Sequence, residues 1–241
     1  MAGAAEWKLD ANDARLNLGS HRAAIDLAAP QRGLHQLVIA EQLLKDCEVL
    51  GVELESVARG GGPVLADAYQ RGGDLIATYA QAPSSMVSTQ IYWRAALREF
   101  EGVVCPTIDL QVSVQTSRLD SHPAVHTHGR LPTCEVVRAG IDRPDSSHAR
   151  EPGSHCVVFR PSAWNESYAE MVHPEDADGC EIGQPNDATI EIVHRLFERE
   201  LEKGVILRAR VRGLFVPRPR DAAIATAAWR QFLEQPPPLT T

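Results

Sequence analysis

Four polar side chains in the first half of the chain have the chemistry needed to hold a carbohydrate. Arg71 and Asp74 flank a Gly-Gly pair, and Tyr92 and Arg94 lie two residues apart in a segment of alternating polarity. A guanidinium donates planar pairs of hydrogen bonds, a carboxylate accepts them, and an aromatic ring covers the apolar side of a sugar. We therefore take these four as candidate substrate-binding residues. The alternative is an Arg–Asp ion pair on a solvated sheet face, with Tyr92 in cross-strand packing.

Three arginines, Arg208, Arg210 and Arg212, alternate with other residues in the segment 205–216. In a strand, side chains two residues apart stand ~6.6–7 Å apart on one face, and a row of guanidinium groups suits an anionic or polyhydroxylated ligand. Arg208 and Arg210 are therefore also candidate substrate-binding residues. The alternative, which we favour, is that the row pairs with carboxylates on an adjacent strand. Candidate partners are Glu191, Glu198 and Glu200.

The segment 169–179 supplies the candidate catalytic residues, Glu170 and His173. A histidine beside a carboxylate is the minimal general acid/base pair, because each group shifts the pKa of the other toward neutrality. Asp176 and Asp178 also match part of a calcium loop, but the glutamate that should close such a loop is absent. We favour an acidic turn as the simpler interpretation of this segment.

His122, His126 and His128 form a third candidate cluster, and their spacing would allow them to share a metal ion. No nearby carboxylates complete such a site, so we favour a solvated polar loop. The chain also lacks a phosphate loop and the GxGxxG, GxSxG and HExxH patterns. No cofactor is therefore predicted.

Alternation of apolar and polar residues with a period of two is the main structural signal in the chain. It is clearest in 107–115 and 87–95, as expected of strands with one buried and one solvated face. Since no regular helices alternate with these segments, the sequence predicts a mainly β protein: a large twisted antiparallel β-sandwich, with residues 1–241 as a single domain. Further strands are expected at 23–27, 34–39, 49–54, 74–79, 134–138, 156–159 and 205–216.

One helix is expected, at Asp221–Glu234, where apolar residues recur at four-residue spacing before a proline run. The segment 188–201 fits either a helix or a strand, and its β-branched and aromatic residues favour the strand. As a strand it would form a hairpin with 205–216. The segment 120–153 is rich in His, Pro, Ser, Arg and Gly and is expected to be mostly loop, with a short strand near Val136.

Composition limits the partners and the compartment. The net charge of -8 opposes binding to nucleic acid or anionic lipid, so neither nucleic acid nor membrane is an expected partner. The chain has no run of ~18 apolar residues and no signal-peptide pattern at its start. Its five cysteines are widely spaced and odd in number. We therefore predict free thiols and a cytoplasmic protein.

Three stretches together resemble a known family: Ala68–Leu75, Ser88–Arg94 and Leu201–Arg210. They resemble an uncharacterised bacterial family whose strand order is similar to the galactose-mutarotase-like (aldose 1-epimerase-like) β-supersandwich. The resemblance implies a twisted sandwich whose concave face holds sugars. Mutarotases carry a catalytic histidine and a late catalytic glutamate within recognisable motifs, and this chain matches neither motif. Catalysis is therefore the property that this departure puts in doubt.

The leading hypothesis is a protein that binds a small carbohydrate or sugar-like metabolite, with an epimerase-type enzyme lacking the standard catalytic motif as its enzymatic form. Two alternatives remain open. One is a non-enzymatic interaction or structural protein whose sheet faces are simply packed or paired. The other is a metal-dependent enzyme that uses the loop His122–His128.

Overall fold

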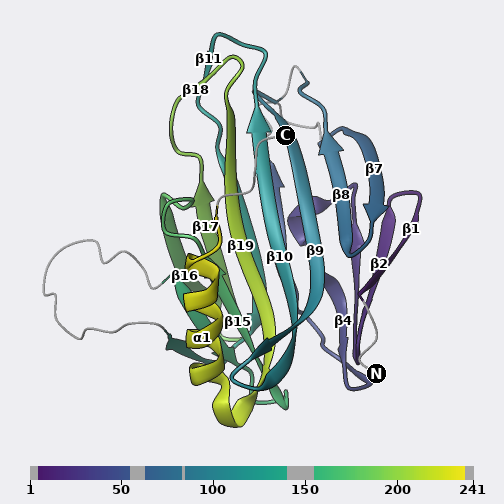
Figure 1. Ribbon diagram of the computed structural model, residues 1–241, viewed down its shortest axis with the longest axis vertical. Coiled ribbons are helices and arrows are strands. Elements are labelled where there is room, and N and C mark those ends of the chain that lie inside the picture. Colours follow the sequence, from purple (N-terminus) through teal and green to yellow (C-terminus); the bar gives the residue numbers. More distant parts are fainter. Residues whose placement is uncertain (1–4, 55–62, 83–84, 140–154, 237–241) are drawn as a thin grey trace, which may run out of the picture.

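The computed structural model describes residues 5–54, 63–82, 85–139 and 155–236, and the chain forms two layers of antiparallel strands with one α-helix (Figure 1). One layer is an eight-stranded sheet. Its strands, in spatial order, are β13 (Glu135–Arg138), β14 (Cys156–Arg160), β15 (Glu166–Val172), β19 (Ile206–Pro217), β10 (Val103–Gln115), β9 (Ser88–Phe100), β8 (Asp74–Tyr79) and β7 (Leu65–Arg71).

The opposite layer consists of a five-stranded and a four-stranded sheet. The five-stranded sheet runs β1 (Glu6–Asp10), β2 (Asp13–Leu18), β3 (His21–Asp26), β4 (His35–Ile39) and β5 (Gln42–Leu43). The four-stranded sheet runs β16 (Gly179–Asn186), β17 (Thr189–Leu196), β12 (Val125–Pro132) and β6 (Glu48–Leu54). The short strands β11 (Asp120–Ser121) and β18 (Leu201–Glu202) pair with each other, and two 3-10 turns, η1 (Pro30–Arg32) and η2 (Arg218–Arg220), complete the elements.

The helix α1 (Asp221–Leu233) packs on the outer face of the eight-stranded sheet, over β14, β15 and β19 (Figure 1). Ile224, Ala228 and Phe232, spaced four residues apart, are buried against this face. The Asp221 carboxylate at its start accepts hydrogen bonds from Arg160 on β14 and Ser167 on β15. The predicted C-terminal helix and the antiparallel β-sandwich are both confirmed.

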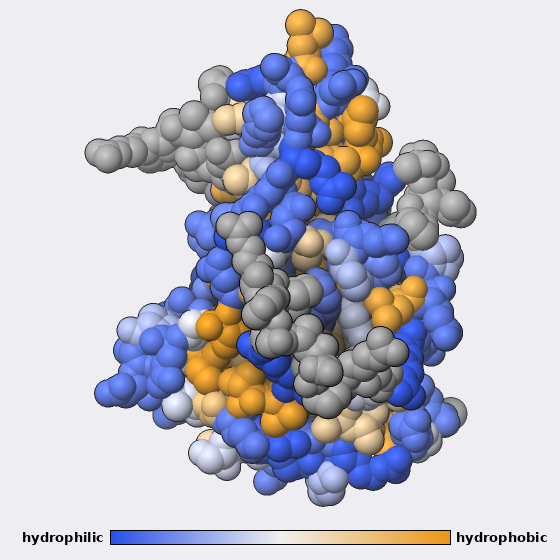
Figure 2. Space-filling view, turned by 90° about the vertical axis from the view of Figure 1, so that its left-hand side faces the viewer, coloured by the Kyte–Doolittle hydropathy of each residue, from blue (hydrophilic) through white to orange (hydrophobic). Residues whose placement is uncertain are grey.

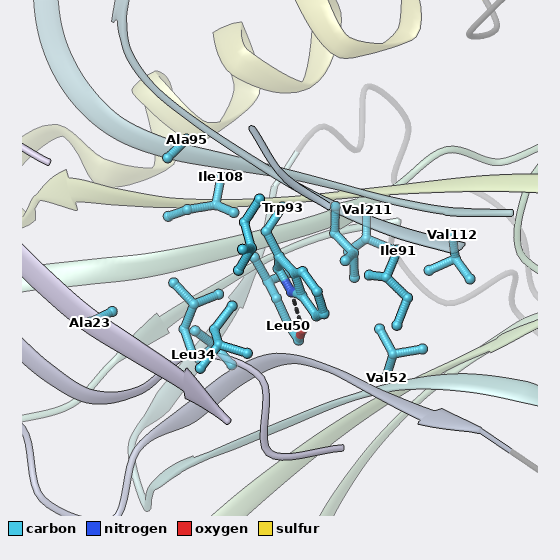
Figure 3. Close-up of a cluster of buried hydrophobic side chains, with 14 of the residues drawn as sticks. Ala23, Leu34, Leu50, Val52, Ile91, Trp93, Ala95, Ile108, Val112 and Val211 are labelled. Atoms are coloured by element: carbon cyan, nitrogen blue, oxygen red, sulfur yellow. Dashed lines mark hydrogen bonds between the residues drawn. The ribbon is translucent and has the colours of Figure 1, made fainter. Parts of the chain in front are cut away.

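The main core lies between the two layers, where the inward-facing residues of each strand meet. Ile91 and Trp93 from β9 and Val112 from β10 point into it, as the two-residue alternation requires (Figure 3). The indole N–H of Trp93 crosses the core and donates to the carbonyl of Leu50 on β6, at 3.2 Å. Since a buried polar group without a partner is costly, such bonds between layers fix how the layers lie on one another.

The strand expected in 188–201 exists, as β17, but its predicted hairpin with 205–216 is wrong. β17 pairs with β12 and β16 in one layer, whereas β19 pairs with β10 and β15 in the other. The loop expected over 120–153 is also wrong in part, because 125–132 is the strand β12. Its alternation is carried by Val125, Thr127, Gly129 and Leu131, and polar and small residues among them obscured the pattern. Residues 140–153 lie outside the described part of the chain.

Two smaller findings concern the cysteines and the edge of the four-stranded sheet. All five cysteines are free thiols, as predicted. The edge strand β16 contains Pro185, and its pairing with β17 shifts register between Gly183 and Asn186.

No helix in the described part of the chain is long and apolar enough to cross a membrane.

The Trp93 hydrogen bond predicts a measurable stability effect. Trp93→Phe keeps an aromatic ring but leaves the buried Leu50 carbonyl without its donor, so the free energy of unfolding should fall by roughly 1–3 kcal/mol in urea denaturation. Trp164→Phe is the control, because the indole of Trp164 is buried but has no hydrogen-bond partner among the described residues. Equal losses in the two variants would show that the hydrogen bond across the layers contributes nothing.

Candidate functional site

The outer face of β8, β9, β10 and β19, beside the helix α1, carries polar side chains in registered rows. Residues directly opposite one another on the four strands form the row Asp74, Arg94, Asp109 and Arg212. The next two rows are Ile76, Tyr92, Gln111 and Arg210, and Thr78, Gln90, Ser113 and Arg208. We call this surface the polar face. Central strands of a sheet hold their side chains in fixed positions, so the polar groups of this face are in place before any ligand binds.

The structure brings Arg71, Asp74, Tyr92 and Arg94 to this face, through the β8–β9 hairpin expected from the sequence. Arg94 donates to both oxygens of Asp74, Nε to Oδ1 at 2.8 Å and Nη2 to Oδ2 at 3.0 Å. The Arg71 Nη2 atom lies 4.0 Å from the same carboxylate. The Tyr92 hydroxyl donates to the Gln90 side chain at 2.7 Å. The Arg–Asp ion pair of the alternative interpretation is therefore present, on the same sheet face as Tyr92.

The predicted pairing of the arginine row with glutamates of 188–201 is wrong, because those glutamates belong to the other layer or follow it. Arg212 is fully buried, and its Nε donates to Asp109 Oδ1 at 2.5 Å. Its guanidinium carbon also lies 4.7 Å from the centre of the Phe232 ring. Arg210 donates to Asp176 at 2.6 Å and to the Gln235 carbonyl at 3.1 Å. Both arginines are therefore committed to internal contacts.

Arg208 differs from the other two members of its row. It is half-buried, and its guanidinium has no hydrogen-bond or ion-pair partner among the described residues. The side chains of Gln111 and Ser113, on the adjacent strand β10, likewise have no hydrogen-bond partner within the described part of the chain. Buried or half-buried polar groups normally find partners inside a protein. These three side chains therefore have hydrogen-bonding capacity to offer to another molecule.

Two hollows lie on the polar face, and Tyr92 borders both. The first, of ≈ 160 Å³, has Thr78, Gln90, Ser113 and Arg208 in its walls. The second, of ≈ 130 Å³, lies toward the end of α1 and is lined by a set of residues that includes Tyr92, Arg94, Asp109, Gln111, Arg210, Phe232 and Pro236. Together they would accommodate a small polar molecule on either side of an aromatic ring.

A third hollow, of ≈ 270 Å³, lies in the other layer, where Arg32, His35, Cys47 and Arg130 contribute to its lining. It contains none of the residues singled out from the sequence. The Arg32 guanidinium beside it is already bound to Glu48, at 2.9 Å. Its other polar lining residues include Gln36, Asp46 and Arg130, which are exposed, whereas Ser113 and Arg208 on the polar face are buried or half-buried.

The structure does not bring the candidate catalytic residues Glu170 and His173 together. Glu170 points into the core between the layers, where it accepts a hydrogen bond from the Tyr168 hydroxyl at 2.6 Å. His173 faces the other side of the sheet, buried beneath α1 with its ring 5.9 Å from that of Phe232. The acidic turn that follows is used structurally, since Asp176 binds Arg210.

The partner of Glu170 is His194, which the sequence analysis did not single out. The two side chains come from opposite layers, on β15 and β17, and His194 Nε2 lies 3.0 Å from Glu170 Oε1. Burial alone would lower the pKa of His194, but hydrogen bonding to Cys180 and Glu170 and the charge of Glu170 outweigh it and raise the pKa to about 9. The only available signal was a histidine at an inward position of an otherwise apolar strand.

The three histidines considered as metal ligands lie along and before β12. His126 and His128 are half-buried on the outward side of β12, and His122 is exposed ahead of that strand. The described residues contain no group of three or more His, Cys, Asp or Glu side chains that could hold a metal ion.

The chain is similar in fold to several proteins of known structure. No protein-family model matches the chain, and no curated protein matches its sequence. A TPR-domain containing protein from Parabacteroides distasonis is similar in structure at a TM-score of 0.55 and 12% identity, covering 95% of this chain and 49% of that one. The chain thus spans about half the length of that protein. The Slr1438 protein from Synechocystis is similar at a TM-score of 0.54 and 6% identity, covering 90% and 96% of the two chains.

A mutant of the heparan sulfate lyase HepC from Pedobacter heparinus is also among the similar structures, at a TM-score of 0.47 and 8% identity, covering 89% of this chain and 37% of that one. The two structures with a TM-score above 0.5 named above are a TPR-domain containing protein and Slr1438 and not galactose mutarotases, so the resemblance to the galactose-mutarotase-like family is wrong. The three stretches behind it lie on strands of the antiparallel sheets and on the turns next to them. At these identities the similarity concerns the fold and does not carry a function.

Two neighbouring carboxylates of the polar face, Asp109 and Asp74, should contribute differently to the free energy of unfolding. Asp109→Asn removes the negative charge beside the fully buried guanidinium of Arg212, so it should lower the free energy of unfolding by roughly 3 kcal/mol or more. Asp74→Asn is the matched control. Its partner Arg94 has 54% of its side chain exposed, so the cost should stay within about 1 kcal/mol. Chemical denaturation measures both, and similar costs would contradict this account of burial.

The pair His194 and Glu170 predicts a pH dependence of stability. Folding raises the pKa of His194 from 6.5 to about 9, so its stabilisation is fully present below pH 6.5 and is lost as the pH rises through 9. The groups that face it are Glu170 and Tyr168 from β15, Cys180 from β16 and His155 beside β14. Over this window the free energy of unfolding should fall by up to about 1.4 kcal/mol per pH unit. Urea denaturation of the wild type and His194→Gln tests this, and an equal slope in both would contradict it.

Proposed function

We propose that this protein binds a carbohydrate or sugar-like metabolite on the polar face, in the two hollows that meet at Tyr92. The observation that carries the proposal is the set of unsatisfied polar groups beside that ring. Gln111, Ser113 and Arg208 have no hydrogen-bond partner among the described residues, yet they stand on central strands of the largest sheet. Amide, hydroxyl and guanidinium groups around an aromatic ring are the usual means of holding a polyhydroxylated molecule.

The charges on this face favour a ligand that carries an acidic group. Arg208 contributes a positive charge that no described carboxylate neutralises. Arg94 is more than half exposed. Because it binds Asp74 through Nε and Nη2, its Nη1 group points away from Asp74. Guanidinium groups bind carboxylate and sulfate-type oxygens in planar pairs. A sugar acid therefore fits the face better than a neutral sugar.

The proposal is for binding rather than for catalysis. Glu170 faces the core and His173 is 7% exposed beneath α1, and neither lines one of the two hollows as a candidate acid or base. A protein that only binds its ligand also needs no such pair. The five free thiols agree with a cytoplasmic location, which stays a prediction.

Calorimetric titration with glucuronate and with glucose tests the proposal. The wild type should bind glucuronate more tightly than glucose. Arg208→Ala and Tyr92→Ala should each weaken glucuronate binding at least about tenfold, the loss of one good polar contact or stacking contact. Arg94→Ala should weaken it too, and because it leaves the buried Asp74 carboxylate with only Arg71 nearby, at 4.0 Å, it should also lower the free energy of unfolding by roughly 1–3 kcal/mol.

Arg22→Ala is the control, since Arg22 is an exposed arginine on β3 in the opposite layer. It should leave binding unchanged. If neither sugar binds the wild type, or if all four variants behave alike, the carbohydrate proposal fails. The interaction-protein hypothesis would then be preferred.

A further inference from the structure

A thiol, an imidazole and a carboxylate meet at one edge of the sandwich, away from the polar face. Cys180 on the edge strand β16 lies directly opposite His194 on β17, and both point toward the space between the layers. Glu170 reaches His194 from β15 in the other layer, with 3.0 Å between Oε1 and Nε2. Figure 2 looks onto this side of the molecule, the side on which β16 and β17 lie in Figure 1, and it shows apolar residues gathered among hydrophilic ones.

The imidazole of His194 is oriented by Glu170, so that its second nitrogen is left for Cys180. Nε2 is engaged by the carboxylate, and the buried Nδ1 has no hydrogen bond of ordinary geometry among the described residues. The Cys180 thiol is nevertheless close enough to raise the pKa of the ring. With its pKa raised to about 9, the buried His194 ring carries a proton on Nδ1 at neutral pH, and this charge opposite Cys180 favours the thiolate form of the cysteine.

The carboxylate that completes the group is itself held in place. The Tyr168 hydroxyl donates to Glu170 Oε2 at 2.6 Å, and Tyr168 has room because residue 213 is glycine. A Cβ atom at Gly213 would lie only 2.5 Å from that hydroxyl oxygen. The order thiol, imidazole, carboxylate is therefore fixed by side chains from three strands, in the arrangement that activates nucleophiles elsewhere.

The other four cysteines lack this arrangement. Cys47, Cys105 and Cys156 are buried, and burial raises the pKa of each thiol. Cys134 is half-buried like Cys180, and burial is the main cause that raises the pKa of its thiol. Cys134 is therefore a natural comparison: a cysteine of similar exposure in the same protein, but without a neighbouring imidazole.

We propose that Cys180 is a nucleophilic thiol, activated by His194 and Glu170, and that it is the site at which this protein forms covalent adducts with small soft electrophiles. In the reaction, the thiol proton goes to solvent, and the thiolate, stabilised by the positive charge of the His194 imidazolium, attacks an electrophilic carbon. With iodoacetamide, a carbon–sulfur bond forms, the carbon–iodine bond breaks and iodide leaves, while His194 keeps its proton. Glu170 is a positioning residue, because it acts through the imidazole.

Timed alkylation of the native protein with iodoacetamide, followed by peptide mass spectrometry at each cysteine, tests the proposal. At neutral pH, Cys180 should react at least about tenfold faster than Cys134, as expected of an activated thiol. This comparison needs no variant. Equal rates at the two half-buried cysteines, or a slower rate at Cys180, would overturn the proposal.

Glu170→Gln and His194→Gln then assign the cause. Each should lower the rate at Cys180 by about tenfold relative to the rate at Cys134. A purely structural role for Glu170 would leave that ratio unchanged, and an unchanged ratio in both variants would overturn the proposed activation. Loss of the fold would be recognised separately, because the buried Cys47, Cys105 and Cys156 would then react as well.

Discussion

The hydrogen bond from the Trp93 indole to the Leu50 carbonyl sets the relation between the two layers. Leu50 has a φ of 55°, uncommon for a residue other than glycine, and it lies where β6 shifts register against β12. The next residue, Gly51, has no room for a side chain, because a Cβ atom there would lie 2.1 Å from the Gln31 carbonyl oxygen. The backbone of β6 is thus bent so that a carbonyl faces the core, and Trp93 satisfies it.

The polar face depends on this contact through the alternation of β9. If Trp93 points inward, Tyr92 and Arg94 on either side of it must point outward. The same rule in β10 sends Asp109 and Gln111 to the outer face while Leu110 enters the core. Most charges on that face are then neutralised across strands, which leaves Arg208 as the exception on which the proposed binding rests.

The sequence predicts what depends on local pattern. The two-residue alternation correctly identified the strands β9, β10 and β19 and their inner and outer faces, and the four-residue spacing identified α1. The hairpin that unites Asp74 with Arg94 was also predictable, since a short connection makes neighbouring strands pair.

Strand partners far apart along the chain were not predictable in this way. β17 could have paired with β19, its neighbour in sequence, and only the packing of whole layers places it beside β12 and β16 instead. The same limit applies to the candidate sites. Glu170 was identified, but its partner His194 belongs to another sheet, and no local pattern connects the two. Histidines at the outward positions, with threonine and glycine among the inward ones, likewise hid the strand β12.

The irregular edge strand β16 has a consequence for how this sandwich behaves at high concentration. An edge strand with a regular row of free N–H and C=O groups is a template onto which another chain can add a strand. Pro185 removes one donor from β16, and the register shift between Gly183 and Asn186 bends the strand out of regular spacing. The outer margin of the four-stranded sheet at β16 is therefore a poor acceptor for a strand of a second molecule.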